Sequence, residues 1–409
     1  MMRRPLPPAG YRRRRPSGVE AARGALDVRR PALVAMLALA IATGCGPAPQ
    51  TPGPSASTGT EPSASAGSAP VQSPVPASAA PSPSSPSPSP SATPTPSPTE
   101  LAQSGYATLD GVAVPDTVGH RLPVAVMVDD NVQARPQYGF NSTSIVYQAP
   151  ADGGEDRYML VFQEQDARRV EPIRSGRPYF VNWAREYKAA FAHYGGDAKT
   201  LYYLPTLEGR IYNIDALKGS GKVFHRDPRR AAPHNGYSNT AAIRALAVSR
   251  TAPTQLPAGI GVLPFTDDLP AAQRPSSGSI NVPYNRGASS YTYDQARNLY
   301  LRSVAGRPQY DALDHKRVTA RNVVVLFMKL SIDPDSEPHH ARPQLRILGT
   351  GRALVFHDGH VYEGTWSKAT LYDVTRFYAS DGTEIPLVRG RIFVQVVPLG
   401  TKVTWVAAR

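Results

Sequence analysis

The sequence predicts a mixed α+β or α/β domain followed by a β-rich domain, with a disordered Pro/Ser-rich tether in front of both. Between residues 116 and 255, short apolar runs alternate with helical patterns, which is typical of strands interleaved with helices. Between 280 and 400 the pattern consists mostly of short strands. From 46 to 105, Pro, Ser, Ala and Thr prevail and large apolar side chains are scarce, so this segment cannot build a core.

The first 45 residues have the layout of a lipoprotein signal. Nine Arg in the first 30 residues precede an apolar run from Ala32 to Thr43, and Ala42-Thr43-Gly44-Cys45 resembles a bacterial lipobox. The run is shorter than the ~20 residues that cross a bilayer. Cys45 is the only cysteine, which excludes an internal disulfide and makes Cys45 the predicted lipidation site. An uncleaved anchor, or a secretory signal with an incidental cysteine, is the alternative.

The 46–105 segment is predicted to separate the folded part from the membrane. Proline-rich chain is extended at ~3.1 Å per residue, so this tether could reach on the order of 150 Å. Together with Cys45, it predicts a protein anchored by lipid to the outer face of the cytoplasmic membrane.

Positive charge is spread over the chain and does not by itself identify a ligand. The net charge is +13, with +7 in the first 30 residues and about +8 from residue 101 onward. A basic exported domain could bind anionic wall polymers or lipid head groups. Nucleic acid fits the charge equally well, although none is expected as a partner. An Arg-rich composition without any ligand is the simplest alternative.

In the N-terminal domain, predicted at 116–255, four apolar runs indicate strands and three segments indicate helices. Pro178 suits the first turn of a helix, with Ser175 or Gly176 near its cap. Asp197 is the expected cap of the next helix, and Asn239 or Ser238 that of the last. The strands are predicted at 122–128, 144–148, 157–162 and 189–194, and the helices at 178–188, 197–203 and 239–248.

In the C-terminal domain, predicted at 280–400, short apolar or alternating runs indicate strands. Asp358-Gly359 and Asp381-Gly382 are turn signals, because Gly accepts a positive φ without steric conflict. The strands are predicted at 291–293, 299–301, 323–327, 345–348, 353–356, 360–362, 375–378 and 392–396.

Several spaced motifs resemble the YerB-like lipoprotein family, a bacterial envelope family with a two-part domain of unknown function. Those of the first half lie at 123–129, 134–137, 151–157, 172–178, 193–196 and 232–235, with Tyr237; those of the second lie at 322–325, 349–351, 364–366 and 375–378. The resemblance implies a signal-anchored lipoprotein with these two domains. It implies no reaction.

Polar residues that follow the predicted strands are the candidate ligand-binding residues. Sites in sheet-based domains gather at strand ends, and Arg suits the bidentate capture of carboxylate or phosphate. Tyr rings can stack on sugars. Ion pairing of these Arg with Asp129, Asp152, Glu155, Asp156 and Glu171 is the alternative, which would only lock the loops together. The candidates are Asp129, Arg135, Asp152, Arg157, Arg174, Arg177, His193, His234 and Tyr237.

The sequence therefore predicts an envelope module that binds a wall component, or that binds or regulates a wall-synthesis or wall-hydrolysis enzyme. A hydrolase or transferase acting on wall polymer is the alternative, with His193, His234 and Asp129 as an acid–base set. No GxSxG nucleophile motif accompanies these residues, which favours binding over catalysis. The His spacing fits no zinc motif and no cofactor motif is present, so neither a metal nor a cofactor is predicted.

Overall fold

The computed structural model describes residues 103–337 and 340–407. Cys45, the signal segment 1–45 and nearly all of the 46–105 segment lie outside the described residues. Their predicted roles therefore remain predictions.

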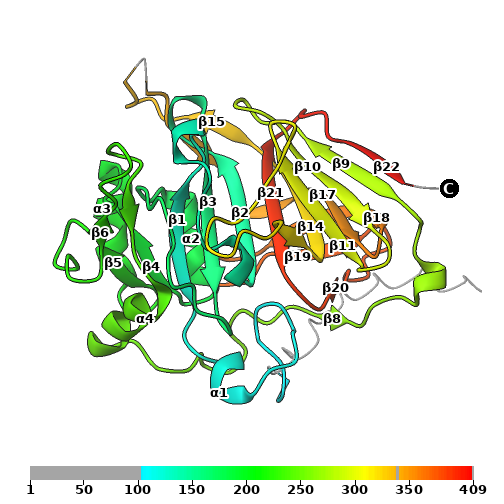
Figure 1. Ribbon diagram of the computed structural model, residues 1–409, viewed down its shortest axis with the longest axis horizontal. Helices are drawn as coiled ribbons and strands as arrows, with labels where there is room; N and C mark the ends of the chain where they lie inside the picture. Colours follow the sequence, from blue (N-terminus) through cyan, green and yellow to red (C-terminus); the bar gives the residue numbers. More distant parts are fainter. Residues whose placement is uncertain (1–102, 338–339, 408–409) are drawn as a thin grey trace, which may run out of the picture. The chain divides into compact units, whose positions relative to one another are not determined.

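A ten-stranded mixed sheet forms the centre of the fold and joins the two halves of the chain (Figure 1). Strand β21, from the C-terminal half, pairs in parallel with β2 on one side and β14 on the other. In order across the sheet, the strands are β19 (Arg376–Ala379), β18 (His360–Lys368), β17 (Gly349–His357), β14 (Asn322–Met328), β21 (Ile392–Pro398), β2 (Ile145–Pro150), β3 (Asp156–Phe162), β1 (Val124–Asp129), β4 (Ala190–His193) and β5 (Tyr212–Asp215).

Both faces of the sheet are buried at its central strands β1, β2, β3, β14 and β21, where apolar side chains alternate to opposite sides of each strand. On one face, Ala125 and Met127 of β1 pack with Trp183 of α2 (Pro178–Glu186). On the other, Val124 and Val126 pack with Ile243 and Ala247 of α4 (Thr240–Ser249). The helices α2 and α4 therefore cover opposite faces of the N-terminal half.

A six-stranded sheet covers the C-terminal half of the large sheet. Its residues Ile280, Tyr291 and Tyr300 share a core cluster with Val323 and Phe393. Its strands are β12 (Arg307–Pro308), β11 (Leu299–Val304), β10 (Ser289–Asp294), β9 (Gly278–Val282) and β22 (Thr404–Ala407), with β13 (Thr319–Ala320) paired to β11.

Three two-stranded pairs and short helices complete the described part of the chain. The pairs are β15 (Leu330–Ile332) with β16 (Pro343–Leu345), β20 (Leu387–Val388) with β8 (Phe265–Thr266), and β6 (His225–Arg226) with β7 (Gly236–Tyr237). The remaining helices are α1 (Asp116–Gly119), α3 (Ala198–Tyr203) and the 3-10 turns η1 (Val132–Ala134), η2 (Phe140–Ser142), η3 (Asp152–Gly154), η4 (Leu204–Leu207) and η5 (Ala271–Gln273).

The predicted fold class is confirmed: a mixed α/β region is followed by a β-rich one. The caps predicted at Asp197 and Asn239 are also confirmed, since Asp197 accepts a hydrogen bond from Thr200 N and Asn239 accepts one from Ala242 N. The Asp358-Gly359 turn joins β17 to β18, with both residues at positive φ. The domain boundaries remain a prediction.

Two local predictions differ from the structure. The strand expected at 345–348 ends at Leu345, because the chain there leaves the small β15–β16 pair and turns toward β17. Ile347 is buried from this loop, which explains its apolar character. The N-cap of α2 is Arg177 rather than Ser175 or Gly176, and it makes no side-chain capping bond.

Candidate polar site at the sheet edge

The carboxyl ends of six parallel strands lie along one edge of the large sheet. Strands β1, β4 and β5 are mutually parallel, as are β2, β21 and β14. Antiparallel β3 lies between β1 and β2, so these two groups run in the same direction. Most of the predicted site residues lie at this edge or in the loops that follow it.

Asp129 is the centre of the candidate site. It ends β1, is fully buried, and its Oδ2 lies 2.6 Å from Nδ1 of His234. The Nε of Arg174 lies 3.1 Å from the same oxygen, an ion-pair contact that lacks the direction of a hydrogen bond. The other oxygen accepts a hydrogen bond from Asn131 N at 3.1 Å. A buried carboxylate thus orients the imidazole of His234, which is 9% exposed, and the half-buried guanidinium of Arg174.

Arg157 adds a second guanidinium beside Asp129. The two residues are direct partners in the β1–β3 register. Arg157 is 3% exposed and donates from Nη1 to the carbonyl oxygen of Ser175 at 3.1 Å and to its hydroxyl at 3.2 Å. Its buried Nε has no partner among the described residues. Burial, with Arg157 and Arg226 nearby, holds the pKa of Arg174 below its usual value.

Arg226 was not among the predicted site residues, yet it lies near Arg174 in the candidate site. Its exposed guanidinium lies 4.5 Å from the Tyr194 ring centroid and donates to Asn235 Oδ1 at 2.8 Å. With Arg226, three cations face two acids, Asp129 and Glu155, the latter bonded to Asn131. The candidate site therefore carries a net positive charge even with His234 neutral. Arg226 lies in a hairpin distant in sequence from β1, so strand-end reasoning could not find it.

Two other predicted arginines form separate ion pairs. Arg177 donates through Nε to Asp152 Oδ1 at 2.7 Å and through Nη2 to Asp152 Oδ2. Arg135 donates from Nη2 to Asp130 Oδ1 at 2.8 Å. Arg177 and Arg135 therefore act as the ion-pairing alternative expects, because each guanidinium holds a loop to a neighbouring carboxylate.

His193 and Tyr237 have structural partners of their own. His193 is fully buried, with Nδ1 2.7 Å from Gly195 O and Nε2 2.8 Å from Asn213 Oδ1. Both ring nitrogens are engaged, so His193 is not available for proton transfer in this conformation. The Tyr237 ring lies 3.9 Å from the Arg169 guanidinium. Neither residue contacts Asp129, and three of the nine candidates, Asp129, Arg174 and His234, form the direct contact group.

A pair of buried carboxyl groups, Asp130 and Asp156, lies on the other face of the sheet from Asp129. Asp130 accepts hydrogen bonds from Arg135 and from Gln148 Nε2 at 3.1 Å. Asp156 is 4% exposed and its carboxyl accepts no hydrogen bond among the described residues. Burial raises the pKa of both carboxyls, and the negative charge of Asp130 raises the pKa of Asp156 further. Asp156 is therefore the member of the pair that retains its proton to higher pH.

We expect Asp156→Asn to stabilise the protein at pH 8, by about 1–3 kcal/mol, because it removes an unpaired buried charge. The raised pKa means that the folded state binds the extra proton, so wild-type stability falls as pH rises above about 4. The gain should therefore vanish near pH 4. Urea unfolding of both proteins at pH 4, 6 and 8 measures it.

Asp166→Asn is the matched control with the opposite sign. Bonds from Thr240 and Arg244 outweigh burial and lower the pKa of Asp166. Its replacement should reduce stability at pH 8, and the loss should fade as pH falls through the lowered pKa. A gain for Asp156→Asn that is equal at pH 4 and pH 8 would contradict this assignment of charge.

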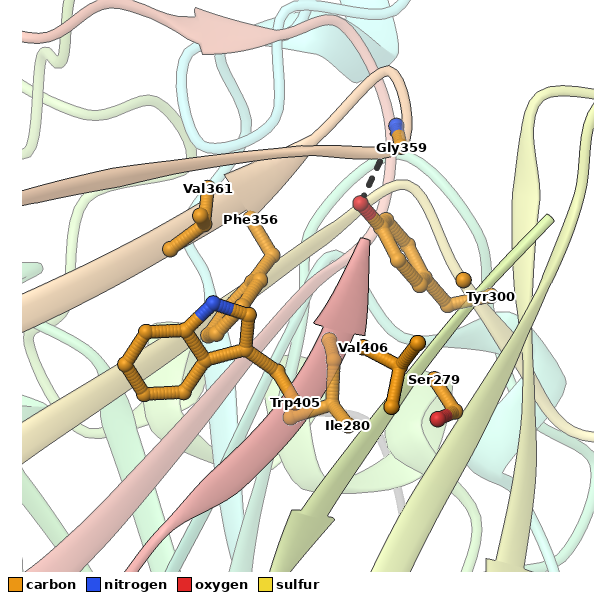
Figure 2. Close-up of a pocket in the computed structure, with 9 residues that line it drawn as sticks. Ser279, Ile280, Tyr300, Phe356, Gly359, Val361, Trp405 and Val406 are labelled. Carbon is orange, nitrogen blue, oxygen red and sulfur yellow. Dashed lines mark hydrogen bonds between the residues drawn. The ribbon is translucent and has the colours of Figure 1, made fainter. Parts of the chain in front are cut away.

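The clearest cavity in the described part of the chain is elsewhere and is apolar (Figure 2). It is a small hollow, partly open to solvent, beside Ile280, Phe356, Val361 and Trp405. Tyr300 on its wall accepts a hydrogen bond from Gly359 N at 3.1 Å. No charged side chain lines it, so it does not suit the anionic ligand that the Arg residues suggest.

Residues 103–337 and 340–407 contain neither a metal-binding cluster nor a membrane-spanning helix. No three His, Cys, Asp or Glu side chains gather there as a metal ion would require. No helix in the same ranges is both long and apolar enough to cross a membrane.

Comparison with known proteins agrees with the predicted resemblance. Residues 109–253 match the N-terminal domain described as "Protein of unknown function (DUF3048)", and residues 280–394 match its C-terminal domain. The chain is 28% identical over 302 residues to "Putative lipoprotein YerB" of Bacillus subtilis strain 168, covering 71% of this chain and 86% of the relative.

A solved structure gives the same result. The crystal structure of YerB protein from Bacillus subtilis matches with a TM-score of 0.65 and 26% identity, covering 74% of this chain and 99% of that chain. Both domain matches occur in the predicted order along the chain, on either side of a short unmatched stretch. The chain therefore belongs to the DUF3048 family and is a distant relative of YerB.

Proposed function

We propose that this protein is a lipid-anchored, extracytoplasmic envelope protein that binds an anionic group of a cell-wall component. The observation that carries the proposal is the contact group of Asp129, Arg174 and His234. Arg157 and Arg226 lie beside it and give an excess of positive charge. A carboxylate or a phosphate would find charge-assisted donors there.

The anchoring part of the proposal rests on the sequence and on a relative. Cys45 follows an apolar run and a lipobox-like motif. The Bacillus subtilis relative bears the name "Putative lipoprotein YerB". Mass spectrometry of the membrane fraction tests it: a diacylated Cys45 is expected, and an unmodified Cys45 or an intact leader would refute the anchor.

We expect Arg174→Ala to weaken binding to purified cell-wall sacculi by roughly 10- to 100-fold. Hydrogen bonds to charged groups contribute about 1.5–3 kcal/mol, and about 1.4 kcal/mol corresponds to a tenfold change. Co-sedimentation of the full-length protein with sacculi, at several protein concentrations, measures the affinity.

The matched control is Arg297→Ala, which removes the same charge from a side chain that is 71% exposed in the β10–β11 turn. It should bind as wild type does. Unfolding curves of both variants separate binding from stability. If Arg174→Ala binds sacculi as tightly as Arg297→Ala, or merely unfolds more easily, the site serves only to hold the loops together.

A hydrolase or transferase acting on wall polymer is the second candidate, because Asp129 orients His234 through Nδ1. Nε2 of His234 makes no hydrogen bond among the described residues, which leaves it available as a general base. Incubating the protein with sacculi and analysing soluble products distinguishes the two. New fragments that disappear in His234→Gln would favour the enzyme, whereas sedimentation without products supports binding.

A wall-enzyme partner is a further form of the binding proposal. An acidic surface on such an enzyme would meet the same Arg side chains. Cross-linking in intact cells, with and without Arg174→Ala, tests it: a cross-linked enzyme that is lost in the variant would favour the protein partner over the polymer.

A further inference from the structure

The segment 216–230 forms an exposed cationic surface, here named the basic hairpin. Lys218, Lys222, His225, Arg226 and Arg229 are all exposed. The single acid in the segment, Asp227, is buried and is already engaged by Arg229 and Arg169. Lys218 and Lys222 form no ion pair among the described residues, so their charge is available to a partner.

A further cation is fixed against this segment from α4. Arg250 donates from Nη2 to Gly219 O at 2.6 Å and from Nη1 to Ser220 Oγ at 3.1 Å. These bonds hold the turn between the two lysines but involve no carboxylate. The charge of Arg250 therefore adds to that of the basic hairpin.

The basic hairpin is continuous with the site at Asp129. Arg226 contributes to the positive surroundings of Arg174 and lies over the Tyr194 ring. The backbone N of Tyr194 donates to Arg174 O at 2.9 Å. His234, which contacts Asp129, closes the same hairpin through its loop to β7. The basic hairpin thus runs through Arg226 into the surroundings of Arg174, and its two exposed lysines precede Arg226 along the chain.

From this continuity we infer that the ligand is a polymer with repeated anionic groups, such as a phosphodiester chain. The inference rests on the proposed function, because one anion of the polymer occupies the Arg174–His234 site. The following anions lie along the basic hairpin. A single carboxylate or phosphate would use the site but would leave the exposed lysines without a role.

A flexible polymer suits this surface better than a bilayer does. The Arg174 and His234 side chains are recessed, at 23% and 11% exposed, so one anion of a flexible chain reaches them more readily than a flat layer of head groups does. The sequence also places about 60 Pro/Ser-rich residues between Cys45 and the described part, enough to separate it from the membrane.

The experiment uses full-length protein in nanodiscs of neutral lipid, with long-chain polyphosphate and inorganic phosphate as probes. Polyphosphate should bind at least tenfold more tightly per molecule than inorganic phosphate. Lys218→Glu/Lys222→Glu should weaken polyphosphate binding at least tenfold and leave inorganic phosphate binding unchanged. If polyphosphate behaves like single-stranded nucleic acid, the salt dependence should lose roughly 0.7 in log–log slope for each contact removed.

Arg297→Glu/Arg307→Glu is the control, since it makes the same charge change on exposed side chains of the six-stranded sheet region. It should reduce polyphosphate binding by less than twofold. If the lysine variant and this control bind polyphosphate equally, the polymer inference is overturned while the anion site at Arg174 stands. If Arg174→Ala leaves inorganic phosphate binding intact, the proposed function itself fails.

Repeating the measurement in nanodiscs that contain anionic lipid tests the bilayer. Polyphosphate affinity of the wild type should stay within twofold of its value in neutral discs. A fall to the level of the lysine variant would mean that the bilayer occupies the basic hairpin, and would overturn the polymer inference.

Discussion

Replacing Arg302 with Met is expected to destabilise the protein by about 3–5 kcal/mol, the range typical when one partner is removed from a buried charged network. Arg302 lies in β11 and is fully buried between the two large sheets. Nη2 donates to Gln148 Oε1 at 2.7 Å and to Ser289 Oγ at 2.8 Å. The substitution would remove the guanidinium donor from both oxygens and leave Gln148 Oε1 with the bond from Ser289 Oγ at 2.8 Å.

The network around Arg302 joins segments that are far apart in sequence. Nη2 also contacts the Tyr158 hydroxyl at 3.1 Å, and Nη1 donates to Gln309. The guanidinium lies 5.2 Å from the Phe393 ring centroid and 5.3 Å from that of Tyr158. Burial opposes its charge, but Tyr158, Tyr291 and Asp130 outweigh burial and raise the pKa of Arg302. The charge is therefore retained inside the protein.

Urea unfolding measures the effect, with Arg302→Lys as the conservative variant and Arg307→Met as the exposed control. Lys keeps the charge but lacks the planar fork, so it should recover only part of the loss. Arg307→Met should stay within about 0.5 kcal/mol of wild type. An Arg302→Met protein as stable as that control would mean that this network contributes nothing to folding.

Lys368→Met is the second substitution with a large expected effect, again about 3–5 kcal/mol. Lys368 in β18 and Glu186 in α2 form an ion pair at 2.6 Å in which both side chains are fully buried. Glu186 also accepts from Thr375 N at 3.1 Å and from Thr375 Oγ1 at 3.0 Å. Without Lys368, the carboxylate would remain buried with hydrogen bonds but no compensating charge.

The loss for Lys368→Met should be larger at pH 8 than at pH 5. Burial already raises the pKa of Glu186, and Lys368 is the main group that opposes this rise. In the variant the folded state holds its proton to still higher pH, so stability falls as pH rises above the unfolded value of about 4.3. Chemical unfolding at the two pH values measures this difference.

The double variant Glu186→Met/Lys368→Met separates the pair from its parts. Apolar residues of similar size often replace a buried ion pair with little loss, so the double variant should be more stable than Lys368→Met alone. Losses that simply add would contradict a direct interaction between the two side chains.

Local sequence patterns were sufficient for most individual elements. Apolar runs at 122–128, 157–162 and 323–327 are strands, because an uninterrupted apolar run of this length fits a strand buried on both faces. Asp197 and Asn239 are helix caps, because a short polar side chain reaches the free backbone N–H groups two or three residues on. These features depend on neighbours within a few residues.

The order of the strands could not be predicted from such patterns. Parallel pairing of β2 with β21 joins residues some 250 positions apart, and many pairings would satisfy the same apolar runs. Short strands such as β5 have no sequence signal of their own, since Tyr212 and Asn213 become a strand only beside β4. Global packing selects among these alternatives.

The candidate site, too, could be predicted from local sequence only in part. The sequence by itself determined which residue types follow the strands, the cysteine at Cys45 and the tether composition. Only the tertiary structure decided that Asp129 contacts His234, that Arg177 and Arg135 are engaged by neighbouring carboxylates, and that His193 is buried with both nitrogens bonded. The Asp129–His234 contact joins residues 105 positions apart, and the other pairings depend on how each loop folds back on its neighbours. Strand ends, caps and signals depend on local chemistry alone.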